Sequence, residues 1–160
     1  MPFSSTPERQ NAIEIAVVNH QRILGVDAAR LKKLVEFALR SESVERASLS
    51  LVFVDDATLH DINRRHLGHD WPTDVVTFDL ADDPSEGVIG ELVVSAEMAK
   101  ITATAAGTDP LAELALYVVH GTLHLCGYDD QTEDQIRRIR ARERELLELD
   151  GWEWTYPRFA

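Results

Sequence analysis

The chain has 160 residues, of which 44% are hydrophobic and 28% are charged, enough for one compact domain with a sizeable core. A formal net charge of −12 at pH 7 argues against indiscriminate binding to a phosphate backbone, so any contact with nucleic acid requires a local basic groove. The single cysteine, Cys126, excludes an internal disulfide framework and favours a reducing cytoplasm.

The first segment, residues 1–11, is polar and contains two prolines, which predicts a flexible N-terminal tail ahead of a single domain over 12–160. This tail has no apolar stretch of the kind that signal peptides carry. The longest apolar run, 114–126, is too short for a membrane span and contains both histidines discussed below. We therefore expect a cytoplasmic protein that does not enter a membrane.

The spacing of apolar residues predicts a mixed set of helices and strands. Strands are predicted over 13–19, 47–54, 72–78 and 88–95. Helices are predicted over 27–40, 55–68, 96–106, 111–126 and 132–149, with Asp27, Ser95 and Asp109 as N-caps. The acidic loop between the third and fourth strands is short enough for an antiparallel connection. The expected fold class is α+β, a four-stranded mixed sheet covered by about five helices.

The helix over 111–126 is apolar nearly all round, which predicts that it is the central buried helix. It carries His120 and His124, which are four residues apart and therefore lie on one helical face. Two imidazoles on one face can converge on a single divalent ion. The sequence thus places a metal site on the central helix.

The residues after this helix supply the rest of the metal site. Gly127 can take a positive φ and end the helix with a sharp turn, after which Asp130, or Asp129 beside it, can provide a third ligand. Three protein ligands and an open position are the arrangement of a catalytic zinc, so we predict one Zn²⁺ held by His120, His124 and Asp130. The alternative is a pair of buried histidines bonded to backbone, with the two aspartates capping the next helix.

The same spacing resembles the zinc-protease motif H-E-x-x-H-x-x-G-x-x-H of the metzincins, with two departures. Gly121 stands where the protease carries its general-base glutamate, and Asp130 stands where it carries a third histidine. A metalloprotease is disfavoured because no other group is evident to take the proton. The missing side chain at Gly121 instead predicts that another backbone segment packs closely beside the metal.

Other side chains with possible roles have plainer interpretations. The arginines of the last predicted helix alternate with glutamates, which is typical of a solvated, salt-bridged outer face; they are Arg137, Arg138, Arg140, Arg142 and Arg144. Cys126 is interpreted as a small core residue. His66 and His69 are interpreted as exposed loop histidines, and Glu133 and Asp129 as capping residues or partners of a ligand.

Three segments together resemble the YbeY family of bacterial rRNA maturation factors. They are Pro-Thr-Asp-Val-Val-Thr-Phe (72–78), Gly-Glu-Leu-Val-Val-Ser (90–95) and His-Gly-Thr-Leu-His-Leu-Cys-Gly-Tyr-Asp-Asp (120–130). The resemblance extends from the first predicted strand to Trp152. It implies a YbeY-like metal-binding domain that acts as a metal-dependent endoribonuclease on single-stranded RNA, in 16S rRNA 3′-end maturation and ribosome quality control, with rRNA or a ribosomal subunit as partner.

The chain departs from the family pattern at two positions. The usual third histidine is Asp130, whose carboxylate zinc also accepts. The position of a functional family arginine is occupied by Leu67, and Arg64 or Arg65 could supply the guanidinium that binds substrate instead. Thr73 and Asp74 are expected to fix the start of a strand beside the metal. No residue is assigned as general base, so the alternative is a ribosome-assembly binding factor with a mainly structural zinc.

Overall fold

The computed structural model describes residues 12–67 and 74–153, so the predicted tail over 1–11 lies outside the described residues. The elements follow the order β1 (Ile13–Asn19), α1 (Ala28–Ser41), β2 (Ala47–Val54), α2 (Asp56–Leu67), β3 (Val75–Asp79), the 3₁₀ turn η1 (Pro84–Glu86), β4 (Val88–Ser95), α3 (Ala96–Ala106), α4 (Pro110–Leu125) and α5 (Glu133–Leu149). The expected α+β class, with four strands and five α-helices among the described residues, is confirmed.

The four strands form one mixed sheet in the order β1-β2-β4-β3. The β1–β2 and β2–β4 pairs are parallel, and β3 pairs antiparallel with β4, as the short acidic loop predicts. That loop also contains the η1 turn, which was not predicted; the Asp83 side chain caps it by accepting from the Ser85 amide. The antiparallel pair forms one edge of the sheet and carries Asp74 at its start.

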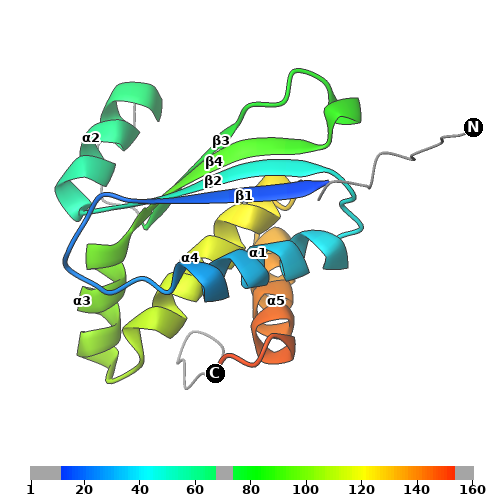
Figure 1. Cartoon of the computed structure of the whole chain (residues 1–160). Helices are drawn as coiled ribbons and strands as arrows, with labels where there is room; N and C mark the ends of the chain where they lie inside the picture. Colours follow the sequence, from blue (N-terminus) through cyan, green and yellow to red (C-terminus); the bar gives the residue numbers. More distant parts are fainter. Residues whose placement is uncertain (1–11, 68–73, 154–160) are drawn as a thin grey trace, which may run out of the picture.

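The helices cover the two faces of the sheet unequally (Figure 1). α1, α3, α4 and α5 lie on one face and enclose the larger core, whose fully buried members include Leu51, Leu92, Leu116 and Leu123. α2 lies on the opposite face over a smaller cluster of Val54, Leu59, Val76 and Val93. This division separates α2 from α4 by the thickness of the sheet.

α4 is the central buried helix that the sequence predicts. Its side chains from Leu114 to Val119 are at most 2% exposed, because the helix packs against β3, β4, α1, α3 and α5. Asp109 caps its first turn by accepting from the Leu111 amide, and Pro110 occupies the first helical position. Within the part of the chain that the structure describes, no helix has the length and apolar character needed to cross a membrane.

α5 departs from its prediction at one residue. Arg137 and Arg144 form exposed ion pairs with Asp134 and Glu148 along the helix, as expected for a solvated face. Arg142 does not lie on that face: its side chain is 21% exposed and binds Glu42 at 2.9 Å and the Ser41 carbonyl. The prediction for Arg142 is wrong because the end of α1 packs against α5 at this point.

Candidate metal centre

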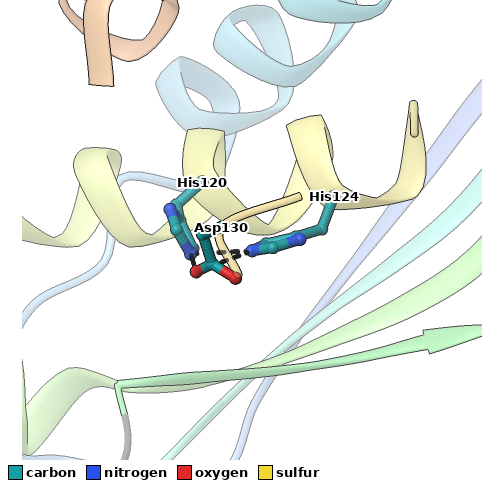
Figure 2. A group of neighbouring side chains, drawn as sticks. All are labelled: His120, His124 and Asp130. Atoms are coloured by element: carbon teal, nitrogen blue, oxygen red, sulfur yellow. Dashed lines mark hydrogen bonds and ion pairs between the residues drawn. The ribbon is translucent and has the colours of Figure 1, made fainter. Parts of the chain in front are cut away.

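The two α4 histidines face each other on one side of the helix (Figure 2). The Nε2 atoms of His120 and His124 lie 3.0 Å apart, and the two rings meet edge to face. Their side chains are 24% and 22% exposed, so both rings are reachable from solvent although α4 itself is buried. The spacing of four residues has therefore produced the convergence that a metal ion requires.

The turn after α4 returns the chain toward these rings. Gly127 has a φ of 102°, which a residue with a side chain rarely adopts. The Tyr128 amide donates to the Leu123 carbonyl at 3.0 Å and the Gly127 amide to the His124 carbonyl at 3.0 Å, which together close a helix-ending turn. This turn places the Asp130 carboxylate between the two rings (Figure 2).

The structure distinguishes Asp130 from its neighbour. Asp130 Oδ2 lies 3.5 Å from His120 Nε2 and 3.4 Å from His124 Nε2. Asp129 is exposed, and its Oδ1 accepts from the Asp130 amide. Neither aspartate caps α5, because Thr132 is its N-cap and forms a reciprocal capping box with Gln135. Asp130 thus belongs to the histidine group, and its side chain is free of a capping role.

The three ligand atoms fit a tetrahedral metal ion. Ligands at about 2.0–2.2 Å from zinc lie about 3.3–3.6 Å from one another in a tetrahedral site. Two of the three separations here, 3.4 and 3.5 Å, lie in this range, and the separation of the two Nε2 atoms, 3.0 Å, is slightly shorter. Among the described residues, one cluster of histidine, cysteine or acidic side chains has a spacing that suits a metal ion. It consists of His120, His124 and Asp130. The Asp130 side chain is 36% exposed, so this carboxylate is partly accessible to solvent.

A buried glutamate contacts the first of these histidines from the other side of the ring. Glu143 Oε1, on α5, lies 2.6 Å from His120 Nδ1. Burial alone would lower the pKa of His120, but the hydrogen bond and charge of Glu143, with the charges of Asp74 and Asp130, raise it above its ordinary value. Glu143 was not predicted from the sequence, although its spacing from Ile139 and Leu147 places it on the buried stripe of α5.

The start of β3 completes the surroundings. The Asp74 carbonyl accepts from the Ser95 amide at 3.0 Å, which fixes the strand start against the end of β4. The Asp74 carboxylate is close enough to contribute to the raised pKa of His120. Thr73, which was expected to act with it, lies outside the described residues, as does His69.

Comparison with known proteins identifies the family of this chain. The sequence model of the family described as "Endoribonuclease YbeY" matches residues 16–150. The chain belongs to the YbeY family. A protein named Endoribonuclease YbeY from Pelotomaculum thermopropionicum is 38% identical over 143 residues, which cover 83% of this chain and 94% of that protein. One of the same name from Geobacter sulfurreducens is 33% identical and covers 86% and 95%.

A solved structure has the same fold. The solution structure of TM1509 from Thermotoga maritima superposes with a TM-score of 0.57 at 23% identity, covering 89% of this chain and 97% of that one. At this level of identity the likeness concerns the fold alone. It agrees with the α+β arrangement of the YbeY family that the sheet order and helices describe here.

Gly121, which stands where zinc proteases carry a glutamate, is closely surrounded by core side chains. A Cβ atom on Gly121 would lie 2.9 Å from Leu92 Cδ2 and 3.2 Å from Val75 Cγ2. The close approach is thus present, but it is made by side chains of β3 and β4 and not by the backbone segment that was predicted. A glutamate at this position would point into the core and not toward the metal ligands.

We expect Gly121→Leu to lower the free energy of unfolding by about 1–3 kcal/mol, because the added atoms overpack a core that has no free volume there. Urea denaturation followed by circular dichroism measures the change. Ala105→Leu, at an exposed position of α3, is the matched control and should leave stability nearly unchanged. Equal stability of the Gly121→Leu protein and the wild type would contradict the packing described here.

Arg64 and Arg65, the predicted substrate-binding arginines, lie apart from the cluster of His120, His124 and Asp130, called the metal group below. Arg64 and Arg65 are in the last turn of α2, on the other face of the sheet from α4 (Figure 1), and both bind Asp61, at 3.0 and 3.1 Å. Their side chains are 59% and 70% exposed. Leu67 is the last residue of α2, and its side chain is outside the described part of the structure.

Two further side chains have clear structural surroundings. His66 lies in α2 and not in a loop, and its ring meets Phe78 edge to face with centroids 6.0 Å apart. Cys126 is a half-buried free thiol packed against the larger core. Burial, with the charge of Glu42, raises the pKa of Cys126 to about 11, so the thiol stays protonated at neutral pH.

Proposed function

We propose that this chain is a zinc-dependent endoribonuclease that cuts single-stranded RNA in the cytoplasm, and that its substrate is rRNA near the 16S 3′ end. The observation that carries the proposal is the group of His120, His124 and Asp130, whose ligand atoms lie 3.0–3.5 Å from one another. Relatives in the same family are named endoribonucleases. The free, protonated Cys126 suits a reducing compartment.

The donor set favours zinc. Two imidazole nitrogens and one carboxylate oxygen, with one direction open, match the ligands of catalytic zinc sites. When bound, the ion supplies Lewis-acid activation of water or of a phosphoryl oxygen. His120 and His124 would hold the ion from a buried helix and Asp130 would supply the third ligand, while Glu143 lies against the ring of His120. A single strand of RNA would approach the ion from the side that these three ligands leave uncovered.

RNA binding must be local because the net charge is −12. Arg64 and Arg65 are exposed cations on α2, the helix whose end is joined by residues 68–73 to Asp74 beside the metal group. We propose that an RNA strand crosses this edge of the sheet, with its phosphates near α2 and the bond to be cut at the open side of the metal. Only a few phosphate contacts are then available.

Replacing Arg64 and Arg65 together by alanine should weaken binding of a short single-stranded RNA. For the wild type, the logarithm of the binding constant should fall only gently with the logarithm of the salt concentration, with a slope of about −0.7 for each phosphate contact. Fluorescence anisotropy over a salt series measures both quantities. Arg140→Ala with Arg144→Ala on α5 removes the same charge and should leave binding nearly unchanged. The opposite pattern would move the RNA site to α5.

One alternative function has a specific observation in its favour. Leu67 replaces the arginine that the resemblance leads us to expect, and no carboxylate here is assigned as general base. Both facts fit a ribosome-assembly factor that binds rRNA and uses its zinc mainly for structure. A metalloprotease is disfavoured, because Gly121 stands where its base would be and the core fills the space beside that glycine.

The test of the proposed function is cleavage of an end-labelled single-stranded RNA by the purified protein. Cleavage should occur with zinc, stop after treatment with a chelator and return when zinc is restored. An RNA hairpin of the same composition is the control and should be cut more slowly. Cleavage by the purified protein that persists after complete metal removal would contradict the proposed zinc dependence.

A further inference from the structure

The contact between α4 and α5 includes a buried carboxylate, Glu143, whose counter-charge among the described residues is His120. Glu143 is 1% exposed and lies among Ile139, Leu146 and Leu147, the other buried residues of α5. Its Oε1 atom lies 2.6 Å from His120 Nδ1, and its Oε2 atom is buried without a hydrogen-bond partner among the described residues. A buried carboxylate is costly unless a cation or a strong donor compensates it. His120 is the group that the structure provides for this compensation.

The hydrogen bond determines what the imidazole can offer. A carboxylate accepts hydrogen bonds, so the His120 Nδ1–H donates to Glu143 Oε1. The proton on Nδ1 leaves the lone pair of a neutral ring on Nε2, the atom that faces His124 and Asp130. The same contact fixes the rotation of the ring, and the negative charge behind it makes Nε2 a better donor to a metal.

We propose that Glu143 is a positioning residue of the metal centre: it orients His120 and raises its affinity for the ion, so α5 forms the outer wall of a site whose ligands lie on α4 and its following turn. This inference rests on the proposed metal centre. It explains why an arginine- and glutamate-rich helix buries one glutamate completely while the glutamates of its outer face, such as Glu145 and Glu148, remain exposed.

The experiment measures the zinc dissociation constant of the full chain by competition with a chromophoric chelator. Glu143→Gln keeps the size of the side chain and one acceptor oxygen but removes the charge. Glu143→Ala removes the charge and the acceptor. Glu113→Gln is the matched control, because Glu113 is also buried, at 2% exposure, and lies two helical turns before His120 on α4. Circular dichroism and the Tm of each metal-free variant report the fold separately from zinc binding.

Loss of a group that supports a metal ligand weakens metal affinity by about 10- to 100-fold. We expect about a tenfold weaker constant for Glu143→Gln and a larger loss for Glu143→Ala, with Glu113→Gln close to wild type. A folded Glu143→Gln protein with wild-type zinc affinity would overturn the inference, as would an equal loss in Glu113→Gln. Failure of the wild type itself to bind zinc would be a different result, since it overturns the proposed metal centre and this inference with it.

Discussion

Replacing His124 by alanine is expected to abolish stoichiometric zinc binding while the protein remains folded. His124 supplies one of three ligand atoms, and its Nε2 atom lies 3.0 Å from that of His120 and 3.4 Å from Asp130 Oδ2. Two remaining ligands do not make a stable zinc site, because such sites in proteins use at least three. Elemental analysis of the purified protein should give about one zinc per wild-type chain and almost none in the variant.

The two neighbouring aspartates provide a matched pair for the same measurement. Asp130→Ala should weaken zinc binding markedly, whereas Asp129→Ala should leave it unchanged, because only the Asp130 carboxylate lies between the histidine rings. Asp130→His should retain the metal, since imidazole is an equally good ligand. Full zinc occupancy in the His124→Ala protein, or loss of zinc in Asp129→Ala, would contradict this ligand assignment.

The second large effect expected is on RNA cleavage. If the metal performs the chemistry, His124→Ala should lower the rate of single-strand cleavage by at least about a hundredfold, because a metal contributes several kcal/mol of transition-state stabilisation. A gel assay with end-labelled RNA and saturating protein measures the rate. The Asp129→Ala protein is the control for a change in the same turn, and it should cut at close to the wild-type rate.

The position of Leu67 allows the enzyme to be distinguished from an assembly factor. Leu67→Arg should raise the cleavage rate, because the resemblance to the YbeY family implies a functional arginine at this position, and a cation near the phosphoryl group would stabilise the negative charge that develops there. Leu67→Met, which changes shape without adding charge, is the control and should have no effect. Absence of cleavage in both the wild type and Leu67→Arg, with rRNA binding intact, would favour the assembly factor.

The parts of the structure that depend on local sequence could be predicted. The apolar circumference of α4, the four-residue spacing of its histidines and the glycine after it predict that His120, His124 and Asp130 come together, as the structure shows. Each of these is set by residues within a few positions of one another. The fold class followed for the same reason, since helical and strand periodicities are short-range patterns.

The parts of the structure that depend on packing between distant segments could not be predicted from the sequence. Glu143 is 23 residues from His120, and only the docking of α5 on α4 brings the two together. Arg142 was predicted to be solvated because nothing in its own helix reveals that the end of α1 lies beside it. Similarly, the location of α2 on the opposite face of the sheet separates Arg64 and Arg65 from α4, a fact that no helical pattern contains.

The most direct test of the metal centre is a crystal structure of the zinc-loaded protein with diffraction data collected on both sides of the zinc absorption edge. We expect one anomalous peak per chain, about 2.0–2.2 Å from the Nε2 atoms of His120 and His124 and from a carboxylate oxygen of Asp130. The contact of His120 Nδ1 with Glu143 should be retained in the loaded protein. A zinc peak elsewhere on the chain, with these three side chains holding no ion, would refute the proposed metal centre.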